Sequence, residues 1–140
     1  MGISSDGILF YGFCYADTDE HPWYVEDEDD EDDEGLIARI FGVPAPEGEY
    51  DRDKYRAYLA ARKPVLEAAG VEVVLHCSYD YAMHGVAVSA SLSRAYRGGP
   101  CEVSPEAQPE WDALLRTLFD KAGWDWPDDP PSWWLTSMYG

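Results

Sequence analysis

Three stretches of the chain carry the apolar, β-branched and aromatic pattern that is typical of buried strands. The first covers residues 8–15, and Gly12 within it predicts a bulge or a close approach of another backbone. The second and third, at 71–78 and 83–92, are separated by only four residues, so they predict an antiparallel hairpin. The pattern therefore predicts a sheet of at least three strands.

Helical spacing marks a long segment between Asp51 and Gly70. Asp51 is a suitable N-cap, the helix should reach Ala69, and Gly70 stands at the C-terminal cap position. Pro64 interrupts this pattern because proline removes one backbone hydrogen bond. We therefore expect the helix to kink or split near residues 61–63.

Two shorter helices complete the pattern. Residues 35–42 predict a short helix that Gly42 ends, and the acids before it would interact favourably with the helix dipole. A further helix should open at Pro109 and end at Gly123, because apolar residues recur at helical spacing between them. We predict one α+β domain, residues 1–140, in which an antiparallel sheet of three or more strands packs with two or three helices. A long acidic loop should follow the first strand, with residues 22–25 holding its middle against the core.

The composition supports a packed domain, since 46% of the 140 residues are hydrophobic and 14% are aromatic. The three cysteines, Cys14, Cys77 and Cys101, lie in no CxxC pair, which argues against a disulfide framework and a zinc site. No signal sequence and no apolar run long enough to span a membrane is visible. We expect a cytoplasmic protein, and a monomer.

Charge is distributed unevenly along the chain. The formal net charge is −18, from 28 acidic and 10 basic residues. The first 34 residues hold 13 acids and no lysine or arginine, whereas the other 106 residues hold 15 acids and 10 bases. Such a field repels nucleic acid and anionic lipid, and it attracts basic proteins more weakly as the salt concentration rises.

Nine consecutive carboxylates run from Glu26 to Glu34, and three interpretations of them are open. A block of like charge is commonly a solvated loop that aids solubility. It can instead imitate a phosphate backbone, which carries roughly one charge per 1.7 Å of duplex axis. A calcium loop is the third interpretation, but a loop that begins at Asp30 has Phe41 at its twelfth position, where a bidentate glutamate is required.

The second interpretation defines a candidate surface for a basic DNA-binding protein partner. Its residues are Asp17, Asp19, Glu20, Glu26, Asp27, Glu28, Asp29, Asp30, Glu31, Asp32, Asp33 and Glu34. A secondary group, Glu47, Glu49, Asp51 and Asp53, would extend it. We expect no direct contact with nucleic acid or membrane.

Little in the sequence points to catalysis. His76 and Cys77 are adjacent on a predicted strand and point to opposite faces, so only one of them could join His84 of the facing strand. No motif of nucleophilic, zinc-dependent or nucleotide-binding enzymes is present. We therefore expect no catalytic residue, no metal and no cofactor.

The C-terminal segment is rich in tryptophan, and we expect most of it to pack back onto the fold. Tryptophan is also the residue most enriched in binding hot spots. Trp133 and Trp134 are therefore a second candidate contact surface. The alternative function is a non-enzymatic module that binds a protein through this C-terminus.

Residues 1–12, together with 70–73 and the hairpin that ends at Ser89, resemble small proteins encoded by phages and prophages. Among the small acidic proteins of such genomes, the chain is similar to anti-CRISPR proteins that act as DNA mimics against type I surveillance complexes. The resemblance implies an inhibitor of host defence that occupies a groove lined by lysine and arginine. It carries over no functional residue, and the acidic residues are nominated from charge.

Overall fold

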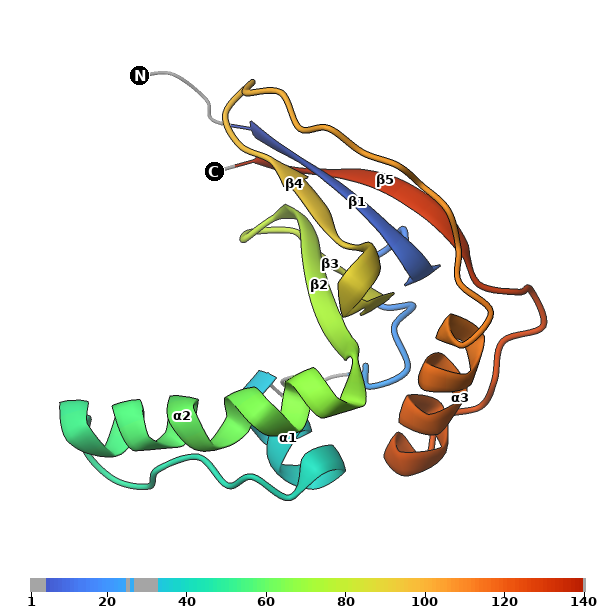
Figure 1. Ribbon diagram of the computed structural model, residues 1–140. Helices are drawn as coiled ribbons and strands as arrows, with labels where there is room; N and C mark the ends of the chain where they lie inside the picture. Colours follow the sequence, from blue (N-terminus) through green and yellow to red (C-terminus); the bar gives the residue numbers. More distant parts are fainter. Residues whose placement is uncertain (1–4, 25, 27–32, 140) are drawn as a thin grey trace.

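The computed structural model describes residues 5–24, 26 and 33–139 of the chain (Figure 1). The strands are β1 (Ser5–Cys14), β2 (Val71–Ser78), β3 (Ala82–Val88), β4 (Ser93–Ala95) and β5 (Ser132–Tyr139). The helices are α1 (Asp33–Phe41), α2 (Arg52–Ala69) and α3 (Trp111–Ala122), and a 3-10 turn, η1 (Ser89–Ser91), follows β3. The predicted α+β class, first strand and hairpin are confirmed, but the second arm of the hairpin ends at Val88 and not at Leu92, because the 3-10 turn begins at Ser89.

The five strands form one mixed sheet in the order β3-β2-β5-β1-β4. β1 pairs antiparallel with β5, β4 and β3, and β2 pairs antiparallel with β3. The prediction of an antiparallel sheet is wrong at one ladder, because β2 and β5 run parallel, with Cys77 opposite Met138 and Ser78 opposite Tyr139. This ladder joins segments that are far apart in the sequence, so no local sequence pattern predicts it.

The sheet is curled, so that β1 and β3, which are not neighbours in this order, also pair. Residues 12–14 of β1 pair with β3, while residues 7–9 pair with β4. The other edge of β1 pairs with β5 along its length, and Figure 1 shows the two strands side by side. The ladders of β1, β3, β2 and β5 thus form a closed ring.

Closure of this ring depends on Gly12. Its φ is +154°, and a Cβ atom there would collide with the carbonyl oxygen of Val86 in β3. Glycine alone lets the two backbones approach so closely. The close approach predicted at this residue is confirmed.

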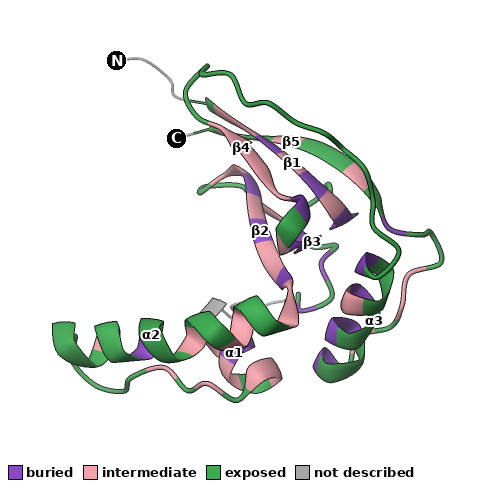
Figure 2. Ribbon diagram, in the orientation of Figure 1, coloured by how far each residue is buried: buried purple, intermediate pink, exposed green. Residues whose placement is uncertain are grey.

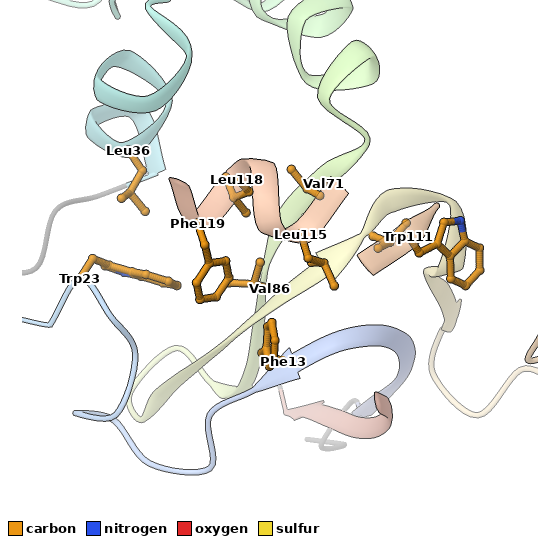
Figure 3. Packing of buried hydrophobic residues seen from close by; sticks show 10 residues of the cluster. Phe13, Trp23, Leu36, Val71, Val86, Trp111, Leu115, Leu118 and Phe119 are labelled. Carbon is orange, nitrogen blue, oxygen red and sulfur yellow. The ribbon is translucent and has the colours of Figure 1, made fainter. Parts of the chain in front are cut away.

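Buried side chains form two clusters, one on each face of the sheet. Ile8, Phe10, Val74 and Ala87 are fully buried within the ring. The second cluster fills the space between the other face and the helices, where the rings of Phe13 and Phe119 lie 5.2 Å apart (Figure 3). The aromatic residues of the chain are concentrated in this second cluster.

The long helix α2 has the predicted ends. The Asp51 side chain accepts hydrogen bonds from the N–H groups of Asp53 and Lys54, and Gly70 ends the helix with φ 69°. The split predicted near residues 61–63 is wrong, because the helix is continuous through Pro64. The carbonyl that loses its partner there belongs to Ala60, an exposed residue, so water can satisfy it.

The other two helices differ little from the prediction. α1 ends at Gly42 with φ 72°, and α3 ends at Gly123 with φ 74°. α3 begins at Trp111, two residues after the predicted start at Pro109. None of the helices in the described part of the chain is long and apolar enough to cross a bilayer.

The tryptophan-rich C-terminus packs onto the fold, as expected, but it does so as a strand. β5 lies between β1 and β2 and pairs with eight residues of β1. Figure 2 shows that the sheet and α3 carry most of the burial, whereas α2 is largely exposed. Removal of β5 would therefore remove a structural element rather than a tail.

Candidate interaction surfaces

The segment between β1 and α1 is anchored to the core by two buried rings. Trp23 stacks on Trp124, with centroids 5.1 Å apart and an interplanar angle of 28°. The His21 ring lies 4.6 Å from the Trp23 ring and 4.5 Å from the ring of His84 in β3. Figure 3 shows Trp23 directed toward the second core cluster. These contacts fix where the segment leaves the sheet.

The sequence predicts that residues 22–25 hold the middle of the segment against the core. That prediction is confirmed at Trp23, whereas Pro22 and Tyr24 are exposed. Val25 lies outside the described residues. The anchor is therefore narrower than expected and rests on the indole of Trp23 together with the imidazole of His21.

Acidic side chains flank this anchor on both sides. Asp17, Asp19 and Glu20 precede it, Glu26 follows it, and all four are exposed. In the part of the chain that the structure describes, no lysine or arginine forms an ion pair with any of the four. Their negative charge is thus directed to solvent and is not neutralised by the protein's own bases.

The remaining acids of the run are placed only in part. Asp33 is the first residue of α1, and Glu34 is half-buried in its first turn, where a carboxylate interacts well with the helix dipole. Six predicted surface residues lie outside the described residues: Asp27, Glu28, Asp29, Asp30, Glu31 and Asp32.

The secondary acidic group lies elsewhere. Glu47, Glu49, Asp51 and Asp53 are exposed on the connector before α2 and on its first turn, and Asp51 is engaged as the N-cap. Figure 1 places the start of α2 at the tip farthest from the end of β1. These four acids are therefore separate from those that flank Trp23.

Trp133 and Trp134 are held by the sheet. The half-buried Trp133 ring lies 5.7 Å from Tyr11 and 6.0 Å from Trp111. Trp134 donates its Nε1–H to the Gly12 carbonyl at 3.0 Å. Leu135 is the most exposed large apolar residue of β5, at 79%, and it is not among the predicted contact residues. Strand alternation does not mark it, because Trp134 and Leu135 are consecutive exposed residues.

Histidine and cysteine side chains lie close together at two places in the fold. His84 faces His21, while His76 Nε2 lies 3.1 Å from the carbonyl oxygen of Tyr15 and 3.5 Å from Cys14 Sγ. Burial lowers the pKa of His76 and raises the pKa of Cys14, so both favour the neutral form. A nucleophilic pair needs the reverse, a thiolate beside an imidazolium. Among the described residues, no three histidine, cysteine, aspartate or glutamate side chains are grouped to hold a metal.

No protein-family model, curated protein or solved structure matches the chain.

Proposed function

We propose that the chain is a non-enzymatic inhibitor that occupies the DNA-binding surface of a basic protein. One observation carries the proposal: Asp17, Asp19, Glu20 and Glu26 are exposed around a buried anchor without ion pairs to described lysines or arginines. Carboxylates next to a rigid anchor lose less conformational entropy on binding than those of a free tail. This arrangement favours a contact surface over a segment that serves solubility alone.

The mechanism is steric and electrostatic competition. Residues 17–34 carry 12 acids and no base. At roughly one charge per 1.7 Å of duplex axis, twelve charges correspond to about 20 Å of DNA. A groove lined by lysine and arginine would therefore exchange its counterions for this segment as it does for DNA. The competition should weaken as the salt concentration rises.

The resemblance to phage-encoded small acidic proteins gives the proposed target its class. We place the inhibitor in the cytoplasm of a bacterial host, where it would block the DNA-binding groove of a type I CRISPR surveillance complex. The chain itself contributes charge and shape, and no bond is made or broken.

Neutralising five acids of the run tests this proposal. The variant D27N/D29N/D30N/D32N/D33N should fail to displace target duplex from a purified type I surveillance complex. The expected loss of apparent affinity is on the order of 100-fold near 150 mM salt, because several charge contacts vanish together. Competition binding measures the effect, and circular dichroism with thermal melting checks that the fold is retained.

A charge-matched variant provides the control. Glu102, Glu106, Glu110, Asp128 and Asp129 are five exposed acids outside the run, and neutralising them changes the net charge equally. This control should compete like the unaltered protein. Equal losses of affinity in both variants would mean that net charge alone explains the effect. Unaltered competition by the first variant would contradict the proposal.

A second candidate function is protein binding through the C-terminal strand. The observation that favours it is the exposed Leu135 on β5, a strand without a charged residue. Deletion from Trp133 onward is not a usable test, because β5 pairs with β1 and β2. The substitution Leu135→Ser is suitable instead: loss of partner binding with an unchanged melting temperature would favour this function.

A further inference from the structure

The strand order brings three exposed tyrosines to one rim of the sheet. Because β2 and β5 run parallel, Ser78 at the end of β2 lies opposite Tyr139 at the end of β5. Tyr79 and Tyr81 lie in the turn that follows β2. The three tyrosines are 77%, 69% and 53% exposed in the order Tyr79, Tyr81 and Tyr139, and they are termed the tyrosine rim.

The backbone that carries the tyrosine rim is ordered. The Tyr81 N–H donates a hydrogen bond to Ser78 Oγ at 3.0 Å, which closes the turn. Cys77, just before the turn, pairs with Ala82 on one side and with Met138 on the other. A partner would therefore meet rings on a fixed frame, and tyrosine adds a large contact area at a low entropic cost.

The rings of the tyrosine rim are not engaged within the described part of the chain. None of them stacks on another described aromatic ring or lies beneath a described arginine or lysine. Two other exposed tyrosines differ, since Tyr50 lies 6.0 Å from Tyr55 and Tyr24 lies 5.9 Å from His21. Three accessible aromatic side chains thus lie at neighbouring strand ends, and exposed aromatic residues gathered in this way are typical of interaction sites.

We propose that the tyrosine rim binds an arginine-bearing surface of a protein partner. Guanidinium groups would stack on the tyrosine faces, and the exposed carboxylate of Asp80, between Tyr79 and Tyr81, would offset their charge. The charge of the turn selects this partner, because residues 73–93 contain Asp80 and no lysine or arginine. The net charge of −18 attracts the same partner from a distance.

Tyr96 sets the limit of this surface. It is exposed and follows β4, whose end lies at the same rim of the sheet. Its sequence neighbour Arg97 is also exposed, and a positive charge there disfavours a second cation. Tyr96 is therefore a matched control and not part of the tyrosine rim.

The inference deepens the proposed function, and it rests on that function for the basic character of the partner. The turn that carries Tyr79 and Tyr81 lies near the acidic segment, because the Tyr15 N–H donates to the His84 carbonyl oxygen and the His84 ring lies 4.5 Å from His21. The two surfaces nevertheless consist of different residues, so each can be disabled by its own substitutions while binding at the other is measured.

The test uses the full-length chain with the five substitutions D27N/D29N/D30N/D32N/D33N, which neutralise five of the nine acids of the run. Nona-arginine, nona-lysine and nona-proline peptides are titrated separately, and NMR resonances of residues 79–81 and 139 report local binding. Nona-arginine should shift these resonances and bind at least about threefold more tightly than nona-lysine, since guanidinium is the better partner for a ring.

Substitutions in the same background assign the effect to the rings. Y79A/Y81A/Y139A should weaken nona-arginine binding about tenfold or more, whereas Y79F/Y81F/Y139F should stay within about threefold. Y96A should bind as the background does, and thermal melting checks that each variant folds.

Four results would overturn the inference: arginine-induced shifts that map elsewhere, equal binding of nona-lysine, tighter binding of nona-proline, or unchanged binding by the alanine variant. Failure of the proposed function is recognised separately. In that case the five-site variant still displaces DNA, whatever the peptide titrations give.

Discussion

The acidic segment and the tyrosine rim are surfaces of different character. Beyond Cys14, the chain exposes carboxylates on both sides of a buried tryptophan. Beside Ser5, the partner strand ends in Tyr139, next to the turn that carries Tyr79 and Tyr81. Charge dominates the first surface, whereas aromatic area on an ordered turn dominates the second.

This difference separates two ways of recognising one class of partner. Carboxylates act over about a Debye length, roughly 8 Å at physiological salt, and lose strength as salt is added. Cation–π contacts act only when the guanidinium reaches the ring, within about 6 Å of its centroid. The acidic segment would accelerate encounter, and the tyrosine rim would add short-range selectivity for arginine.

The substitution Gly12→Ala should have the largest effect, because it removes the frame that both surfaces share. The new methyl group would meet the Val86 carbonyl oxygen, and φ at this position disfavours any side chain. We expect a loss of about 4 kcal/mol or more in the free energy of unfolding, which is a large part of the stability of a small domain. Chemical denaturation measures it.

Gly48→Ala is the control for backbone strain alone. Its φ is +86°, but a Cβ atom there meets nothing within 4 Å. A cost of about 1 kcal/mol is expected from the unfavourable backbone conformation. Equal losses at the two glycines would show that the close approach of β1 and β3 is unimportant.

Trp23→Ala should come second and should act mainly on the acidic segment. It removes a buried indole that stacks on Trp124, at a cost of about 3–4 kcal/mol in stability. Freed from this anchor, the flanking acids must be ordered on binding, so affinity for the basic partner should also fall roughly tenfold. Denaturation and competition binding follow the two quantities.

Val74→Ala separates these two effects. Val74 is fully buried in the inner cluster, and its truncation should cost about 2–3 kcal/mol. Affinity should stay unchanged in this variant at temperatures where it is folded. If both variants lose affinity equally, global destabilisation explains the loss and the anchor has no specific part in it.

Local sequence signals predict much of the frame on which the surfaces lie. Asp51 and Gly70 mark the ends of α2 because capping satisfies the terminal backbone groups through nearby residues. The hairpin of β2 and β3 follows from two β-prone stretches with a short connection. Trp23 is predicted to reach the core because a large apolar side chain within a charged segment has few other favourable environments.

The tyrosine rim could not be predicted in the same way. It exists because β5 lies between β1 and β2 and pairs with both. The pairing of Cys77 with Met138 cannot be recognised from a local sequence pattern. The two tryptophans of β5 predict a tail that packs on the fold. They do not predict a strand, because β1, the strand that pairs with β5, is at the other end of the chain. Surfaces made by neighbouring residues are thus readable from the sequence, whereas surfaces made by strand order require the fold.

The smallest effect should come from the hydrogen bond that ties the middle of β1 to α3. Tyr11 donates its hydroxyl to Asp112 Oδ1 at 2.7 Å. Burial, the hydrogen bond and the charge of Asp112 raise the pKa of Tyr11 from 10.0 to about 12. Since the pKa is higher in the folded state, the stabilisation from this group is complete below pH 10 and is lost as the pH rises to about 12.

Tyr11→Phe should therefore cost about 1 kcal/mol in unfolding free energy at pH 8, without changing affinity at either surface. The difference from the unaltered protein should shrink steadily between pH 10 and pH 12 in urea denaturation, because the unaltered protein loses its hydroxyl hydrogen bond there. Asp112→Asn removes the charge but retains an acceptor, so the folded-state pKa of Tyr11 should be raised less, and the decline should still begin near pH 10 but end at a lower pH. A difference between Tyr11→Phe and the unaltered protein that stays constant up to pH 12 would mean that this hydrogen bond does not link β1 to α3 in solution. The midpoint of β1 would then be held by the Tyr11 and Trp111 rings, whose centroids lie 5.6 Å apart.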